Sequence, residues 1–484
     1  MKDIWQALEE RTRAWDALGR QGLADAIWAD YVSMRFGRTG DPRALEYLYP
    51  YLNHANQDVR KHAVGVAAQV FEGRGPRAID ALDYFTKNPD LFLHDRAVQV
   101  VGAAVTGSPD AVVLEVLAPY LSHRNQFIRK QALIVLGKAA AGQASGKVLA
   151  EIQRVAQMPG PREDEADFAI ATVFAGRPTQ DVYALVAKPE LANRIDTGNQ
   201  QAVAILVRGA SDEWYQRACG EVFEPRLHAD DATGWRRHFI RRNGINALCH
   251  AAPGRGMEPL RRMLHLRNNR CTGHAIVTSA PECFAGADAD ANQAALIELA
   301  REGDLQEQRI AAVCLGRLVM GADDRQSIDL LRELCDARSK AVQSAALTGL
   351  GMAARSTCDE QLRQICLEGA LDDETAAAAI RALGMVFLGS GRADVFEDIR
   401  AKTDLYRTRP VRSKKYCKPL AACYYAAGLL YLGTGSTEPL EFLLDVLAAP
   451  RAHRMDEYHW VAARALVMIE FSEATLGWDY ILFT

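Results

Sequence analysis

Arginine is concentrated in one segment of this 484-residue chain. Residues 233–274 contain nine arginines, no lysine and one acid, Glu258. The planar guanidinium group makes paired hydrogen bonds to carboxylate or phosphate and stacks on aromatic rings. The segment therefore predicts a site that binds an anionic group or an acidic partner, and we assign these residues to it: Trp235, Arg236, Arg237, Arg241, Arg242, Arg261, Arg262, Arg267 and Arg270.

A second basic segment covers residues 400–418, with eight basic side chains against one acid, Asp404. Arg412, Lys414 and Lys415 in this segment are added to the predicted binding residues. The formal net charge of the whole chain is −4, so any attraction for a polyanion must be local. The alternative is that the arginines of the first segment pair internally with acids of the next acidic stretch, such as Asp288, Asp290, Glu298, Glu302, Asp304 and Glu307.

Two patterns resemble functional motifs but depart from them. Residues 142–147 resemble a phosphate-binding loop, yet the first glycine is one residue too close and Val148 replaces the hydroxyl that binds magnesium. We interpret this segment, like Gly433–Ser436, as a turn between helices. Zinc-type ligands also occur, but their spacing matches no compact zinc module: Cys249, His250, Cys271, His274 and Cys283.

No nucleophile-elbow, kinase or paired His–Glu signature occurs in the sequence. We therefore predict no catalytic residue, no metal and no cofactor, and we expect a binding protein rather than an enzyme.

The elements that must position these residues are predicted from an internal repeat. Residues 48–64 and 117–133 share ten of seventeen positions at an offset of 69, and half of that offset is the length of a helix pair. Seven of the eleven intervals between successive anchor alanines lie between 33 and 37 residues. A methyl side chain lets the second helix of each pair pack closely against its neighbours. The twelve anchors are Ala63, Ala97, Ala132, Ala169, Ala202, Ala247, Ala275, Ala312, Ala346, Ala379, Ala422 and Ala465.

The repeat resembles the HEAT family, in particular its bacterial form related to phycobilisome-lyase repeats, from about residue 42 to 470. The resemblance implies an all-α fold, a right-handed α-α superhelix (HEAT/armadillo-type solenoid) of about twelve helix pairs. It also implies an internal polar ladder of Asp58, Arg60, Asp95, Arg96 and Arg129. The residues that carry it, besides the anchors, are the first-helix prolines and the basic starts of second helices: Pro50, Pro119, Asp58–Arg60, Asp95–Arg96 and Asn125–Arg129.

Three regions are expected. Residues 1–41, with Trp5, Trp15 and Trp28, are predicted to cap the N-terminal end, because terminal repeats must cover an open core. Residues 42–470 form the solenoid, with basic insertions near 225–274 and 400–418, and insertions in solenoids often lie on the binding face. Residues 471–484 form an aromatic tail.

Composition favours a cytoplasmic protein. The ten cysteines occur singly, which is typical of a reducing compartment. The first twenty residues lack the apolar core of a signal peptide, and the longest apolar run, Leu420–Leu432, has thirteen residues, fewer than the roughly twenty that a membrane-spanning helix needs.

The resulting hypothesis is a non-catalytic scaffold or adaptor that binds a protein partner on its concave surface, because most HEAT solenoids act this way. The alternatives are a nucleic-acid-binding protein related to repair, and a bilin-lyase-like enzyme or chromophore chaperone.

Overall fold

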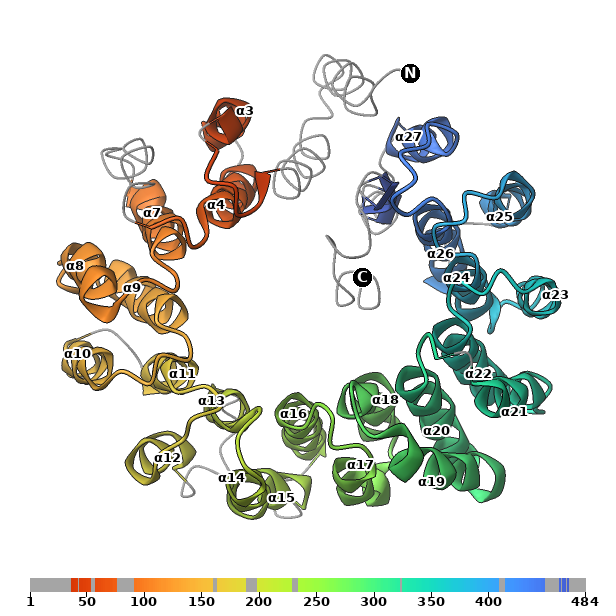
Figure 1. Cartoon of the computed structure of the whole chain (residues 1–484), viewed down its shortest axis with the longest axis horizontal. Helices are drawn as coiled ribbons and strands as arrows, with labels where there is room; N and C mark the ends of the chain where they lie inside the picture. The colour runs from red at the N-terminus through yellow and green to blue at the C-terminus, as the bar shows by residue number, and fades with distance from the viewer. Residues whose placement is uncertain are drawn as a thin grey trace. The chain divides into compact units, whose positions relative to one another are not determined.

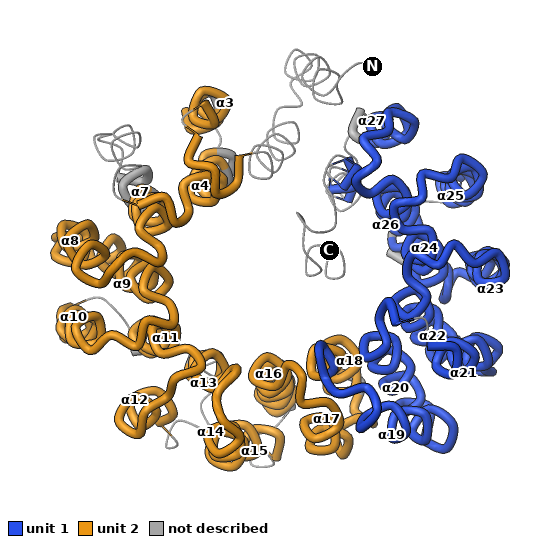
Figure 2. Tube along the Cα trace, in the orientation of Figure 1, with its two compact units in different colours: residues 1–34, 284–484 blue, residues 35–283 orange. Residues whose placement is uncertain are grey.

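The computed structural model describes residues 36–41, 43–53, 57–75, 91–159, 163–188, 198–228, 234–322, 324–408, 414–448, 461–462, 464–466 and 468–469. The predicted N-terminal cap before residue 36 and the aromatic tail lie outside these residues. All regular structure in the described part is helical, so the all-α fold class is confirmed. The chain divides into two compact units, residues 35–283 (unit 2) and residues 1–34 with 284–484 (unit 1), each described by itself (Figure 2).

Unit 2 consists of two rows of helices (Figure 1). The second helices of successive pairs contact one another in order along the chain and form what we call the inner row: α4 (Gln57–Phe71), α7 (Leu91–Ala104), α9 (Gln126–Ala139), α11 (Glu163–Val173), α13 (Gly198–Val207), α16 (Gly234–Ala251) and α18 (Arg270–Ser279). The first helices form the outer row: α3 (Arg43–Leu52), α8 (Asp110–Leu121), α10 (Gly146–Ala156), α12 (Gln180–Ala187), α14 (Asp212–Ala218), the π-helical turn η2 (Cys219–Phe223), α15 (Glu224–Leu227) and α17 (Met257–Met263). Two short 3-10 turns, η3 (Leu264–Leu266) and η4 (Ala280–Phe284), follow α17 and α18.

Unit 1 repeats the same arrangement. Its inner row is α20 (Leu305–Leu318), α22 (Lys340–Ala353), α24 (Ala376–Val386) and α26 (Lys414–Leu430), each in contact with the next. Its outer row is α19 (Ala289–Glu302), α21 (Arg325–Cys335), α23 (Glu360–Gly369), α25 (Ala393–Arg407) and α27 (Leu440–Ala448). None of the described helices is both long enough and apolar enough to cross a membrane.

The anchor alanines are confirmed as packing positions, because all twelve are buried. Glycine accompanies them at the closest approaches between inner helices. A Cβ built on Gly137 would lie 2.7 Å from the Cα of Ala169, and one built on Gly351 would lie 2.8 Å from the Cα of Ala382. Neighbouring inner helices therefore touch through their backbones, which only a methyl group or a hydrogen atom permits.

The turns that follow inner helices join each pair to the next. In the turn after α4, the N–H groups of Gly73 and Gly75 donate to two carbonyls at the end of α7, those of Ala103 and Ala104, at 2.9 and 2.7 Å. Both glycines have positive φ, which glycine adopts without steric cost. The last carbonyls of a helix have no partner within it. The same bonds recur in unit 1, where the N–H groups of Gly389 and Gly391 donate to the carbonyls of Leu429 and Leu430 at 2.9 Å. Turns of this kind cap the following inner helix, which explains their glycines.

Arg129, which was expected to pair with aspartate in the internal polar ladder, has other partners. This side chain is 7% exposed and donates to the carbonyl oxygens of His123 and Arg124 at 2.6 and 3.0 Å, and to that of Pro159 in the next pair. Its partners are backbone carbonyls and no aspartate, because the turns around it supply carbonyls that no helix satisfies. The side chains of Asp58, Asp95 and Arg96 lie outside the described residues.

Candidate functional site

The predicted arginine site does not form one surface. Arg237, Arg241 and Arg242 lie on α16 in the inner row, whereas Arg261 and Arg262 lie on α17 in the outer row (Figure 1). Arg267 follows η3, is half-buried, and donates to the carbonyl of Leu264 at 2.9 Å. The backbones of Trp235, Arg236 and Arg270 are helical, but their side chains lie outside the described residues.

Two arginines of the segment have a structural role in the outer row. The Nε of Arg262 donates to Glu258 at 2.6 Å, and its guanidinium also contacts Glu224 and Gln216. Arg255 pairs with Asp212 and lies over the ring of Tyr215, 4.0 Å from the ring centre.

The internal pairing that we kept as an alternative therefore holds for these two arginines, but with acids of their own unit: Asp212, Glu224 and Glu258. These contacts fasten α17 to α14 and α15. Tyr215 completes the contact by donating to Glu258 at 2.8 Å, and burial raises the pKa of this tyrosine.

The inner-row cations of unit 2 are different. Arg208, at the end of α13, and Arg242, on α16, are exposed, and neither forms a hydrogen bond or ion pair with any described residue. Lys138, at the end of α9, shares this property. Arg237 and Arg241 are half-buried. Among the predicted arginines whose side chains the structure describes, Arg242 is therefore the one whose exposed group faces solvent from the inner row. Sequence reasoning missed Arg208 and Lys138.

Polar side chains accompany these cations on α13, α16 and α18. On α16 and α18 the exposed positions are spaced by three or four residues, which places Arg242 with Asn246, and His274 with Thr278, on one face of each helix. The exposed position of α13 is Gln201. The hydroxyl of Ser279 donates to the Asn246 amide oxygen at 3.0 Å, linking α18 to α16. Burial lowers the pKa of His250, and nearby Arg208 lowers it further while Glu282 opposes the shift. Arg208 and His250 are therefore neighbours across α13 and α16. We call the exposed side of α13, α16 and α18 the α13–α18 face.

The residue before each anchor alanine distinguishes this face. In unit 2 from α9 onward these residues are Gln131, Phe168, Gln201, Asn246 and His274. In α20, α22, α24 and α26 of unit 1, the residue before the anchor is always alanine: Ala311, Ala345, Ala378 and Ala421. The signal is present in the sequence, and it separates a row rich in hydrogen-bonding side chains from a row of methyl groups.

The second basic segment is also divided. Arg400, Lys402 and Arg407 lie on α25 of the outer row, while Lys414 and Lys415 begin α26 of the inner row. Arg400 pairs with Glu397 at 2.8 Å, and Arg407 donates to the Tyr424 hydroxyl at 3.3 Å. The amino group of Lys402 donates to the Leu367 carbonyl at 3.3 Å, and burial lowers its pKa. Arg412 and the side chains of Lys414 and Lys415 lie outside the described residues.

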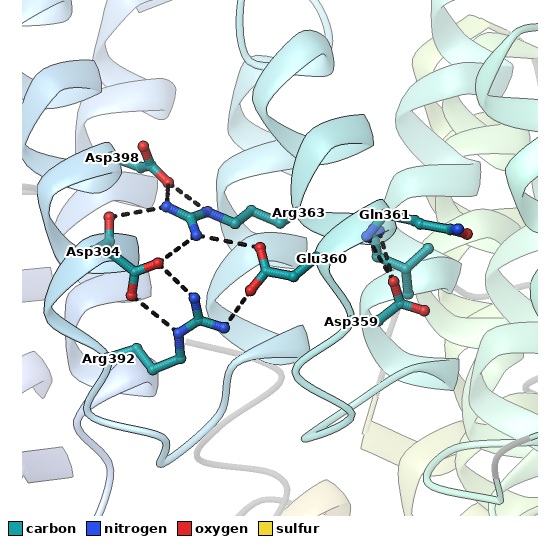
Figure 3. Close-up of polar contacts among 8 residues, drawn as sticks. Asp359, Glu360, Gln361, Arg363, Arg392, Asp394 and Asp398 are labelled. Carbon is teal, nitrogen blue, oxygen red and sulfur yellow. Dashed lines mark hydrogen bonds and ion pairs between the residues drawn. The ribbon is translucent and has the colours of Figure 1, made fainter.

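The most extensive charge network of the described outer row joins α23 to α25 in unit 1 (Figure 3). Arg363 pairs with Asp398 at 2.6 Å and with Asp394, and Arg392 pairs with Glu360 and Asp394. Hydrogen bonds from Arg392, and then from Arg363, hold the pKa of Asp394 well below its usual range. Since every carboxylate of this network has an arginine partner, the network joins helices and offers no unpaired charge to a ligand.

The two motif-like patterns have structural explanations. In residues 142–147, the N–H groups of Gly142 and Ala144 donate to the carbonyls of Thr172 and Val173 at 3.1 and 2.9 Å, so they cannot bind phosphate. Ser145 caps α10 by accepting from the N–H of Val148. Within the described residues, no three His, Cys, Asp or Glu side chains are grouped as metal ligands would be. Cys249 instead contacts Met263 at 3.7 Å.

A hollow of about 730 Å³ occurs in unit 1, where the turns after α20 and α22 meet the start of α23. Its lining includes Arg355, Thr357, Asp359 and Glu360. The Asp359 carboxylate accepts from the N–H groups of Gln361 and Leu362 at 2.7 and 3.2 Å. The Thr357 hydroxyl donates to the Ala354 carbonyl at 2.8 Å. These polar groups serve the ends of helices, and no nucleophile is paired with a base among them.

The solved structures that are similar to this chain include the following three. Two are crystal structures of importin beta, in an ammonium sulfate and a polyethylene glycol condition, with 12% and 13% identity and TM-scores of 0.37 and 0.39. They are matched over 89% and 97% of this chain and over 64% and 70% of theirs. The third, of Kap95p with RanGDP, has 12% identity and a TM-score of 0.34, over 88% of this chain and 62% of that chain. This chain spans about two thirds of the length of these proteins.

No family model matches the chain, and no curated protein matches it. The fold itself, stacked helix pairs with HEAT-like anchors, is established by the rows of helices described above.

Proposed function

We propose that this chain is a non-catalytic scaffold that binds a polypeptide partner on the α13–α18 face of unit 2, with acidic side chains of the partner at Arg208 and Arg242. The observation that carries the proposal is the contrast between the two rows. Arg255 and Arg262 of the outer row are neutralised by acids of the chain, while Arg208 and Arg242 are exposed without an acid partner among the described residues.

The neighbouring side chains support a polypeptide as the ligand. Asn246 lies one turn after Arg242 on α16, and Gln201 is exposed on α13 two turns before Arg208, so both offer amide donors and acceptors on the α13–α18 face. An extended backbone offers the complementary N–H and C=O groups at regular intervals. Cations together with amides therefore suit a polypeptide that has acidic side chains. The charged pairs are expected to contribute mainly to the association rate and the specificity of binding.

A reducing cytoplasm is the compartment we propose, because the described cysteines are unpaired. The relation to the phycobilisome-lyase form of the HEAT repeat stays a prediction from the sequence motifs. A bilin-lyase-like enzyme or chromophore chaperone is the alternative function that this relation suggests. Incubation of the protein with bilin and candidate acceptor subunits tests that alternative, and the absence of a coloured adduct would contradict it.

Capture of partners from native lysate by three proteins tests the proposal: the natural chain, the variant Arg208→Glu with Arg242→Glu, and a control. The control, Lys147→Glu with Arg261→Glu, changes the net charge equally at exposed outer-row positions of the same unit. We expect the first variant to lose its partner and the control to keep it. Reversing two contacting charges should weaken affinity at least about tenfold, which corresponds to about 1.4 kcal/mol.

Equal capture by the two variants would contradict the proposal. Nuclease treatment separates the alternative, because a partner held through nucleic acid would be released by nuclease, and direct binding of nucleic acid would fall steeply with salt.

A further inference from the structure

Arg381 is exposed on α24, in the inner row of unit 1, and forms no hydrogen bond or ion pair with any described residue. It belongs to neither basic segment of the sequence, and the scaffold proposal for unit 2 does not involve it. Arginine is protonated at neutral pH, so this position carries a full positive charge.

The surroundings of Arg381 are uncharged. The residues before the anchors are alanines on its own helix and on both neighbours: Ala378 on α24, Ala345 on α22 and Ala421 on α26. Met385, one turn further along α24, is 5% exposed. The acid that precedes Arg381 in the sequence, Glu374, lies seven residues earlier, in the turn before α24.

The neighbouring protein also reduces the hydration of this cation. Burial lowers the pKa of Arg381 although its side chain is accessible to solvent, as occurs for a group in contact with water on one side and surrounded by protein on the others. Tyr425 of α26 is close enough to influence the guanidinium. An anion at this position would compensate for the lost hydration.

We propose that Arg381 is a binding position for one oxyanionic group, a carboxylate or a phosphate, presented by a ligand that lies on the inner row of unit 1. The planar guanidinium offers two parallel N–H donors to such a group. Ala378 and Ala345 are themselves buried, so the guanidinium of Arg381 is the exposed group that α24 offers to a ligand. This position is independent of Arg208 and Arg242, so failure of either proposal leaves the other unaffected.

Site-resolved modification by phenylglyoxal tests the proposal. This reagent reacts with the neutral guanidine, so an anion that stabilises the charged form slows the reaction at that arginine. Arg261, which is exposed on α17 and has no ion pair among the described residues, is the control. The rate at each arginine is followed by peptide mass spectrometry with inorganic phosphate, with glutarate, and with chloride at matched ionic strength.

We expect phosphate or glutarate to slow modification of Arg381 and not of Arg261. For a Kd of about 1 mM, about 10 mM ligand should slow the reaction about tenfold. Protection by phosphate alone assigns a phosphate ligand, protection by glutarate alone assigns a carboxylate, and protection by both supports the shared oxyanion chemistry. No protection by either, or equal protection of Arg261, overturns the proposal.

The variant Arg381→Gln gives a second readout. A ligand that binds the folded state stabilises it by RT ln(1 + [L]/Kd) and so raises the unfolding temperature. The anion-dependent rise should disappear in Arg381→Gln and persist in Arg261→Gln. A rise that persists in Arg381→Gln would place the anion elsewhere and overturn the assignment.

Discussion

Gly137 and Gly65 are a matched pair that tests the packing of the inner row. Both lie inside inner helices of unit 2, on α9 and α4. A Cβ on Gly137 would lie 2.7 Å from the Cα of Ala169 and 3.0 Å from its carbonyl oxygen, whereas a Cβ on Gly65 would meet nothing within 4 Å. The same substitution to alanine should therefore have opposite effects on stability at the two positions.

The magnitudes follow from two contributions. Replacing a helical glycine by alanine stabilises a helix by about 0.5–1 kcal/mol. We expect this gain in full for Gly65→Ala. At Gly137 the new methyl must displace backbone atoms of α11, and overpacking of this kind costs about 1–3 kcal/mol. The net result for Gly137→Ala should be a loss of up to about 2 kcal/mol, localised at the contact of α9 with α11.

Hydrogen exchange measured by mass spectrometry is the appropriate assay, because a helical-repeat chain need not unfold in one step. Peptides from α9 and α11 should exchange faster in Gly137→Ala, and peptides from α4 should exchange more slowly in Gly65→Ala. If Gly137→Ala protects α9 as Gly65→Ala protects α4, the close backbone contact does not exist and the account of the anchors is wrong.

Two further predictions concern unit 1 and the cysteines. Because hydrogen bonds from Arg392 and Arg363 lower the pKa of Asp394, its contribution to stability is present above the unfolded pKa of about 4 and decreases as pH falls below it. Denaturation across pH should therefore show the difference between the natural chain and Asp394→Asn shrinking below about pH 4, and a constant difference would contradict the pairing. Under native conditions a thiol reagent should label the exposed Cys271 faster than the buried Cys366, whose pKa burial raises, and equal rates on peptide mapping would refute the assigned burial.

The repeat could be predicted from the sequence because burial imposes a period on it. Each anchor must be small wherever two inner helices touch, so the requirement recurs once per helix pair. The glycine that completes the contact was not recognised, although it also recurs, five residues after the anchor in Ala132–Gly137, Ala346–Gly351 and Ala379–Gly384. It was missed because glycine inside a helix is ordinarily taken as a sign of a turn or a chain end.

The candidate site could be predicted only in part. Counting charge along residues 233–274 treats the segment as one surface, but the chain passes from the inner row at α16 to the outer row at α17 and back at α18. Charge along a sequence contains no information about these layers. It also contains none about partners, since Glu224 and Asp212 pair with arginines 38 and 43 residues away. Arg208 was missed because it stands alone in the sequence.

The residue before each anchor determines what the inner row offers to a ligand. Adjacent positions in an α-helix differ by about 100°, so when the anchor faces the neighbouring inner helix, the residue before it is directed away from that contact. Glutamine, asparagine and histidine at this position in unit 2 are exposed at Gln201, Asn246 and His274. The alanines at the same position in unit 1, Ala311, Ala345 and Ala378, are buried, and the exposed side chain of α24 is Arg381. Two units with the same packing rule can therefore bind by different means, one through several hydrogen-bonding side chains with its cations and the other through one guanidinium.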